Sequence, residues 1–150
     1  MKTRLVRPDD ATTWRAMRRE LWPGAGEAEL SDEIRAYFTG TSPLHVVFLC
    51  EDSSARPIGF LEVSLRSYSE GCRSSPVPHV EGWYVVPEAR CRGVGQALMA
   101  AAEEWARGRG FSELASDVEL TNKTGERAHL KAGFEEVERA IHFRKSFRAY

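Results

Sequence analysis

The stretch Val85-Val86-Pro87-Glu88-Ala89-Arg90-Cys91-Arg92-Gly93-Val94-Gly95-Gln96-Ala97-Leu98 decides how this chain is interpreted. An apolar run stops at Pro87, a short basic loop with two glycines follows, and a helical sequence then begins. Gly93 and Gly95 let the backbone approach a ligand closely. The first amides of a helix point outward at the positive end of its dipole, and Arg90 and Arg92 add charge that matches phosphate oxygens. The stretch therefore predicts a pyrophosphate-binding loop, and an ordinary strand–turn–helix connection is the alternative.

Two common phosphate-binding loops do not fit this stretch. A P-loop requires a Lys-Ser/Thr pair after its second glycine, and none is present here. A dinucleotide fingerprint requires a third glycine, but the residue three positions after Gly95 is Leu98. The pattern that remains is Arg-x-x-Gly-x-Gly, formed by Arg90, Gly93 and Gly95.

Length and charge limit the possible functions. The chain has 150 residues, enough for one α/β domain over 1–150 with a real core. Its 21 basic and 22 acidic residues give a net charge of −1, so no overall field favours nucleic acid or an anionic membrane. The charges are unevenly placed, with basic residues from Arg90 to Arg109 and acidic ones near Glu81, 117–119 and 135–138. This distribution predicts an anion site beside walls suited to a cation.

Cysteines and histidines indicate no metal site. The three cysteines are odd in number and lack ligand spacing, and the four histidines form no i, i+4 pair. No apolar segment suggests export or a membrane span, so a reduced cytoplasmic protein is expected.

Apolar periodicity predicts an alternating order of strands and helices. A strand at 3–6 precedes two helices, the first starting at Pro8-Asp9 and the second at 27–38. Strands at 45–50 and 58–66 form a hairpin, and a polar loop at 67–78 follows. The remaining predicted elements are a strand at 80–86, a helix at 93–109, a strand at 111–116, a helix at 122–131 and a strand pair at 134–137 and 141–147.

This order and the loop together resemble the GNAT superfamily of N-acetyltransferases along essentially the whole chain. A second motif, Asn122 followed by His129-Leu130-Lys131-Ala132-Gly133-Phe134, is similar to a GNAT segment as well. The resemblance implies an α/β (α+β) fold with a central mixed, largely antiparallel sheet, splayed central strands and flanking helices. It also implies acetyl-CoA as co-substrate, with cofactor contacts at Trp83, Tyr84, Val85, Arg90, Cys91, Arg92, Gly93, Val94, Gly95, Gln96 and Asn122. The backbone N–H of Val85 is the expected oxyanion donor.

A narrower resemblance is to the aminoglycoside 6′-N-acetyltransferases. It is carried by Leu21-Trp22-Pro23-Gly24, Gly71-Cys72-x-Ser74-Ser75-Pro76-Val77, Val80-Glu81-Gly82, Ala115-Ser116-Asp117 and Gly133-Phe134-Glu135-Glu136-x-Glu138-Arg139. These segments lie outside the loop, so they concern the acceptor. The resemblance implies acceptor contacts at Trp22, Tyr68, Glu81, Asp117 and Glu138, and a homodimer joined through the C-terminal strands.

Each implied role has a plainer alternative. Glu81 is expected to act on the acceptor amine, either as the base or as its binding carboxylate, but it could also be a solvated strand residue. Asp117 could be a helix N-cap, Glu138 part of a solvated acidic face, and Trp22 a core residue. Many GNAT members have a tyrosine where this chain has His129, which is expected either to protonate the leaving thiolate or to be a surface histidine.

The resulting hypothesis is an acetyl-CoA-dependent aminoglycoside 6′-N-acetyltransferase that confers antibiotic resistance. Two other functions stay open at this point. One is a GNAT enzyme for a polyamine, a peptide N-terminus or a lysine. The other is a non-catalytic acyl-CoA-binding sensor.

Overall fold

The computed structural model describes residues 1–148, and the chain divides into two compact units, 1–117 and 118–150. The first unit contains β1 (Lys2–Leu5), η1 (Pro8–Asp10), α1 (Ala11–Leu21), α2 (Glu27–Thr39), β2 (Leu44–Glu51), β3 (Pro57–Arg66), β4 (Val77–Val85), η2 (Pro87–Ala89), α3 (Val94–Gly108) and β5 (Ala115–Ser116). The second unit contains α4 (Lys123–Lys131).

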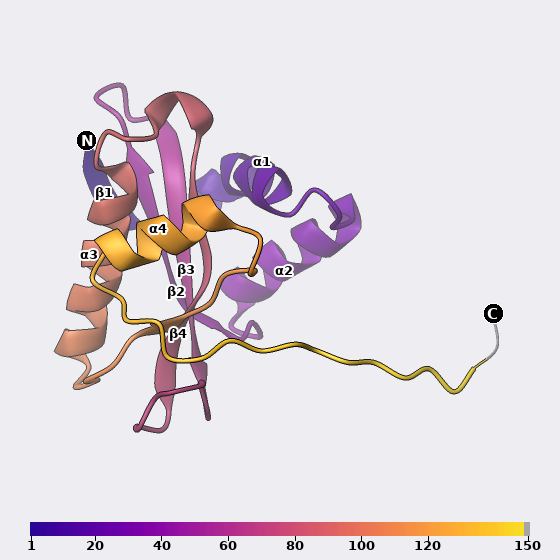
Figure 1. Cartoon of the computed structure of the whole chain (residues 1–150). Coiled ribbons are helices and arrows are strands. Elements are labelled where there is room, and N and C mark those ends of the chain that lie inside the picture. The colour runs from indigo at the N-terminus through magenta and orange to yellow at the C-terminus, as the bar shows by residue number, and fades with distance from the viewer. Residues whose placement is uncertain (149–150) are drawn as a thin grey trace. The chain divides into compact units, whose positions relative to one another are not determined.

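The first unit is built on a five-stranded sheet in the order β1-β2-β3-β4-β5. Its first four strands pair antiparallel, and only β4 and β5 run parallel. The helices α1 and α2 lie against one face of this sheet and α3 against the other, as Figure 1 shows. This is the mixed, largely antiparallel sheet with flanking helices that the family resemblance implies.

Amphipathic helices close the core on each face of the sheet. In α1 the buried side chains are Trp14, Met17 and Arg18, a spacing that places all three on one stripe. Trp14 and Met17 pack with Phe60 and Tyr84 of the sheet. On the opposite face, Val94 and Leu98 of α3 press so closely on β3 that a Cβ at Gly59 would lie 3.1 Å from Leu98.

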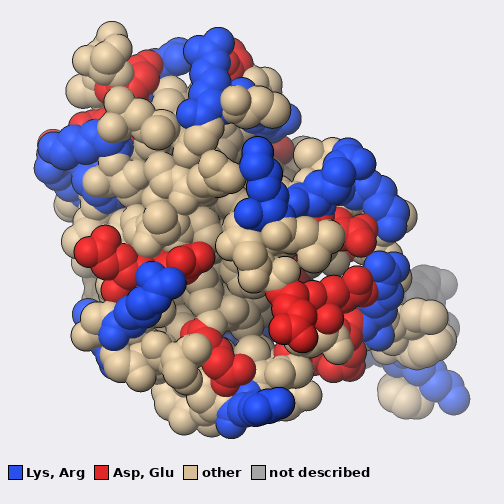
Figure 2. Space-filling view, turned by 60° about the vertical axis from the view of Figure 1, so that its left-hand side comes forward, with Lys and Arg blue, Asp and Glu red and all other residues tan. Residues whose placement is uncertain are grey.

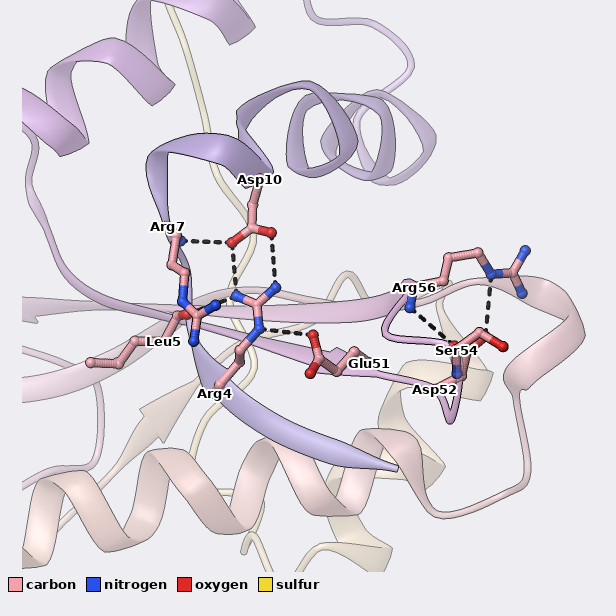
Figure 3. A network of polar contacts seen from close by, with 8 residues as sticks. All are labelled: Arg4, Leu5, Arg7, Asp10, Glu51, Asp52, Ser54 and Arg56. Carbon is pink, nitrogen blue, oxygen red and sulfur yellow. Dashed lines mark hydrogen bonds and ion pairs between the residues drawn. The ribbon is translucent and has the colours of Figure 1, made fainter.

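An ion-pair network fixes the first strand to the turn that follows it. The Arg4 guanidinium donates to both carboxylate oxygens of Asp10, at 2.8 and 2.9 Å, and its Nε donates to Glu51 at 2.8 Å (Figure 3). Asp10 also accepts from the Arg7 backbone at 2.7 Å. The hydrogen bond from Arg4 lowers the pKa of Asp10 despite partial burial, so the network is charged at neutral pH.

The strands β4 and β5 diverge after a very short contact. Their pairing consists of His79↔Ala115 and Val80↔Ser116, although β4 continues to Val85. Beyond Val80, the side of β4 that faces away from β3 is therefore not paired with β5. The splayed central strands expected from the sequence are present at this point.

The predicted C-terminal strand pair is wrong for this chain. Residues 134–147 form no strand, and Ile141, Phe143 and Phe147 are exposed. Their alternation is that of a strand, but a strand also needs a hydrogen-bonding partner, and no described strand pairs with the segment. The strand expected at 111–116 is likewise shortened to Ala115–Ser116.

Surface charge is mixed on the face drawn in Figure 2. Acidic side chains gather in several groups beside basic ones, and neither sign covers the surface, in keeping with the net charge of −1. Among the described residues, every helix is too short or too polar to span a bilayer.

Candidate functional site

Unusual backbone conformations shape the loop before α3. Gly93 is the N-cap residue of this helix and has φ of +84°, in the left-handed region that favours glycine. Cys91 has φ of +61°, which is uncommon for a residue with a side chain. Val94 is buried, while Cys91, Arg92 and Gln96 are exposed. The first residue of α3 is therefore anchored in the core, while the loop residues before it and Gln96 in its first turn are in solvent.

Trp83 contacts the loop, whereas the Tyr84 ring lies in the core. The Trp83 Nε1 donates to the Gly95 carbonyl at 3.1 Å, and a Cβ at Gly95 would lie 3.3 Å from the same ring. The Tyr84 ring is 7% exposed and lies beside Phe60 in the core. A contact from Tyr84 to a ligand in the loop would have to come from its backbone.

The backbone of Val85 faces the open side of β4. The Val86 amide donates to the Ile58 carbonyl at 2.9 Å, so these two residues form a hydrogen-bonded pair of the antiparallel ladder. Hydrogen-bonded and non-hydrogen-bonded pairs alternate along such a ladder, so Gly59↔Val85 is a non-hydrogen-bonded pair. The N–H and C=O of Val85 therefore point away from β3. The Arg90 Nε donates to the Val85 carbonyl from that open side at 2.9 Å. The Val85 N–H is thus directed away from β3.

Glu81 lies at a β-bulge. The register between β3 and β4 runs Glu62↔Gly82 and then Val63↔Val80, which leaves Glu81 as the extra residue. A bulge changes the direction of a side chain within a strand. Here it turns the Glu81 carboxylate to the face that carries Ser64 and Arg66.

Two neighbours on β3 bind the Glu81 carboxylate. Arg66 donates through Nε and Nη2 at 2.8 and 2.9 Å, a bidentate pair, and the Ser64 hydroxyl donates at 2.5 Å. Partial burial acts to raise the pKa of Glu81, but these hydrogen bonds outweigh it and hold that pKa below its ordinary value. Glu81 is therefore an ionised carboxylate at neutral pH and a weak base.

Asp117 meets the same face through His79. The His79 side chain is 2% exposed, its Nδ1 lies 3.0 Å from Ser69 Oγ, and its Nε2 lies 3.3 Å from Asp117 Oδ2. The Asp117 carboxylate is 76% exposed, and together with Glu81 it raises the pKa of Arg66. We call Ser64, Arg66, His79, Glu81 and Asp117 the acceptor-side cluster, after the acceptor contacts that the family resemblance implies at Glu81 and Asp117. Asp117 is not the N-cap of α4, since Asn122 holds that position.

Trp22 lies at the other end of this face. A Cβ at Gly82 would lie 2.7 Å from Trp22 Cη2, so only glycine lets the indole lie on β4. The Arg18 guanidinium lies over the Trp22 ring, 4.9 Å from its centroid. Arg18 is itself held by the buried Glu62, whose Oε1 accepts from it at 2.8 Å, and by an ion pair with Glu33. Trp22 is half-buried, and Tyr68 is 65% exposed.

The remaining predicted residues belong to the second unit. The Asn122 side chain accepts from the Gly125 amide at 2.9 Å and caps α4. His129 Nδ1 donates to the Gly125 carbonyl at 2.7 Å, so neutral His129 has no proton on Nε2. A proton donor at Nε2 would have to be the imidazolium form. Glu138 is exposed in the segment after α4.

Sequence reasoning missed Arg18, Arg66 and His79. One signal was available for Arg66, because Glu62, Ser64 and Arg66 alternate along β3 and make one face of that strand polar. Nothing local to Arg18 or His79 indicates their partners, which lie 44 and 38 residues further along the chain. Within residues 1–148 no group of three potential ligands is placed to hold a metal ion.

Comparison with known proteins identifies the family of this chain. Residues 12–134 match the profile of the Acetyltransferase (GNAT) family. An aminoglycoside N(6′)-acetyltransferase type 1 of Klebsiella aerogenes is 47% identical over 145 residues, covering 94% of this chain and 95% of that protein. Another of the same name, from Serratia marcescens, is 38% identical, with 92% and 94% covered.

The fold is matched as closely as the sequence. The solved structure of AAC(6′)-Iy in complex with the bisubstrate analogue CoA-S-monomethyl-acetylneamine superposes with a TM-score of 0.88 at 34% identity, over 97% of each chain. Family profile, sequence relatives and structure therefore agree, and the chain belongs to the GNAT family of acetyltransferases.

Proposed function

We propose that this protein is an aminoglycoside 6′-N-acetyltransferase, which moves the acetyl group of acetyl-CoA to the 6′-amine of the antibiotic. The observation that carries the proposal is the position of the Val85 amide. It lies on the open side of β4, with the Gly93 loop after it and the Glu81 carboxylate before it along the same strand. The similar proteins named for this activity support the acceptor.

The donor fits the loop and the open strand. The unpaired amides at the start of α3 and the exposed Arg92 suit the pyrophosphate of CoA. The side of β4 left open beyond Val80 would receive the pantetheine arm. Asn122 belongs to the proposed donor contacts through the family resemblance. Arg90 supports the loop by its hydrogen bond to the Val85 carbonyl.

The reaction is a direct transfer. The neutral amine nitrogen attacks the thioester carbon, the N–C bond forms, and the C–S bond breaks to release the CoA thiolate. The developing oxyanion accepts a hydrogen bond from the Val85 N–H. The ammonium proton leaves to water, and the thiolate takes a proton from His129 in its imidazolium form or from solvent. Holding both substrates side by side supplies much of the rate enhancement.

Glu81 binds and orients the acceptor amine in this proposal. Its low pKa keeps it negative, which favours an ammonium group next to it but makes it a weak base. Proton removal then proceeds through water hydrogen-bonded to Glu81. Asp117 and Glu138 bind the remote ammonium groups, and Trp22 and Tyr68 supply aromatic walls for sugar rings.

The proposed enzyme is a cytoplasmic homodimer of one domain over 1–150. The matched family region crosses residue 117, where the two compact units meet in sequence, which supports treating them as one domain. The exposed Ile141, Phe143 and Phe147 suit association with a second copy. Acetyl-CoA is a cytoplasmic metabolite, and acetylation there would protect the cell from the drug.

An acetyl-transfer assay tests this function. Release of CoA is followed with a thiol reagent while the acceptor is varied among neomycin, paromomycin, spermidine and a peptide. Neomycin and paromomycin differ by an amine or a hydroxyl at the 6′ position, so turnover of neomycin and little turnover of paromomycin is expected. Efficient acetylation of spermidine or the peptide, without that of neomycin, would overturn the proposed acceptor. Binding of acetyl-CoA without any transfer would indicate a sensor.

A further inference from the structure

His79 joins three elements at the acceptor-side cluster. It pairs with Ser64 of β3 and with Ala115 of β5, and its ring nitrogens lie near Ser69 of the preceding loop and Asp117 at the end of β5. The imidazole is buried, whereas the Asp117 carboxylate beside it is largely exposed. His79 thus lies behind a carboxylate that solvent or a ligand can reach.

The partners of the imidazole determine which nitrogen carries its proton. A carboxylate only accepts hydrogen bonds, so Nε2 must carry a proton for its 3.3 Å approach to Asp117 to be favourable. Nδ1 then accepts from the Ser69 hydroxyl at 3.0 Å. In the structure Nε2 is fully buried and makes no hydrogen bond of good geometry, although it faces Asp117. A buried nitrogen in this state is costly, and a small movement of Asp117 toward it would remove the cost.

We propose that His79 is a positioning residue for the acceptor, which holds the Asp117 carboxylate where it binds an ammonium group of the substrate that is remote from the reacting amine. The inference rests on the proposed function. His79 itself touches neither the donor nor the reacting atoms. By positioning Asp117, His79 favours acceptors with several ammonium groups over acceptors with one.

Two amide variants separate the two ring nitrogens. The Gln amide nitrogen in His79→Gln falls near Nε2 and keeps a donor toward Asp117. In His79→Asn it falls near Nδ1 and keeps only the contact to Ser69. For tobramycin, kcat/KM is expected to fall about tenfold in His79→Asn and less than about threefold in His79→Gln. The loss is smaller for 6-amino-6-deoxyglucose, which has a single amine. The exposed His45→Asn serves as a control with wild-type kinetics.

A double-mutant cycle with Asp117→Asn tests the coupling. If His79 acts through Asp117, then His79→Asn costs no more than about twofold once Asp117 has been changed. Additive losses would overturn the proposal, and so would equal losses in His79→Gln and His79→Asn. Should His79→Asn fail to fold, Ser69→Ala loosens the same imidazole and is expected to lower kcat/KM for tobramycin only when Asp117 is present. The same change in both backgrounds would contradict the inference.

A spectroscopic measurement separates this inference from the proposed function. Nitrogen NMR of the histidine rings of the wild-type protein is expected to show His79 protonated at Nε2. A neutral ring protonated at Nδ1 would overturn the positioning role whatever the enzyme acetylates. Wild-type protein that turns over 6-amino-6-deoxyglucose but no aminoglycoside would instead overturn the proposed acceptor.

Discussion

The two ends of the open part of β4 are built in different ways. The proposed donor end is one continuous segment, from Val85 through the Gly93 loop into α3. The proposed acceptor end is assembled from β3, β4, β5 and α1, with partners such as Glu81 and Arg66 brought together by the sheet. The first is specified by residues that are neighbours in sequence, but the second exists only once the sheet and its bulge have formed. A GNAT enzyme can therefore change its acceptor by changing scattered side chains without disturbing the donor loop.

Val85→Pro has the largest expected effect. It tests the Val85 N–H, the proposed oxyanion donor, which lies between these two ends. Proline removes the N–H that faces the open side of β4, and the ladder with β3 does not use that N–H. We expect kcat to fall about 100- to 1000-fold, the usual cost of removing an oxyanion donor. Steady-state kinetics measures the loss, and circular dichroism checks the fold. A folded variant with kcat within about tenfold of wild type would exclude Val85 as the donor.

Glu81→Gln tests the acceptor end. It removes the charge that we propose binds the amine and keeps the side-chain size, and kcat/KM for tobramycin should fall about 10- to 100-fold, as for a lost charge-assisted hydrogen bond. Because the pKa of Glu81 is lowered, the carboxylate is already ionised well below neutral pH. The rise of kcat/KM between about pH 6 and about pH 9 then reflects the acceptor amine and should persist in the variant. Loss of that rise would identify Glu81 as the titrating base instead.

The donor loop should respond to a change of backbone conformation. Gly93→Ala adds a Cβ at φ of +84°, where the space is open but the conformation is strained. We expect the affinity for acetyl-CoA, measured by calorimetry, to fall about tenfold, which corresponds to about 1.4 kcal/mol. Gly108→Ala, at the other end of α3, meets neither a neighbour nor a positive φ and is the matched control. Equal acetyl-CoA binding by both variants would contradict the loop assignment.

These two ends also differ in how far the sequence predicts them. The loop is predictable because Pro87, the two glycines and the apolar stripe of the helix act within a few residues of one another. The environment of Glu81 is not, because the register shift at Glu62 and Val63 changes which side chains share its face. Strand alternation could not reveal that shift, and it left the solvated alternative open.

In the C-terminal segment the sequence pattern predicts a feature that the structure does not have. Ile141, Phe143 and Phe147 carry a strong strand pattern, yet the described chain forms no strand there. The pattern reports what each residue prefers, whereas a strand depends on a partner that the segment itself does not contain. The sequence therefore predicted the sheet of the first unit well and this segment poorly.

Gly82→Ala tests the position of Trp22, the proposed aromatic contact for a sugar ring. The added Cβ would lie 2.7 Å from Trp22 Cη2 and 3.2 Å from Phe60, so the indole must move away from β4. We expect KM for tobramycin to rise about fivefold and KM for acetyl-CoA to stay within about twofold of wild type. Gly26→Ala, where a Cβ meets nothing within 4 Å, is the control. A rise in both KM values would show that the change reaches the donor end.

Salt should produce the smallest effect on kcat/KM for the acceptor, measured at saturating acetyl-CoA. The Asp117 carboxylate is largely exposed, so its attraction for a remote ammonium group is screened as ionic strength rises. Between about 50 mM and about 500 mM salt, kcat/KM for tobramycin should fall about threefold, and by less for 6-amino-6-deoxyglucose, which has no second ammonium group for Asp117 to bind. In Asp117→Asn the salt dependence for tobramycin should approach that of the monoamine. An equal dependence of the two acceptors in the wild-type protein would mean that charge at this end acts only on the reacting amine.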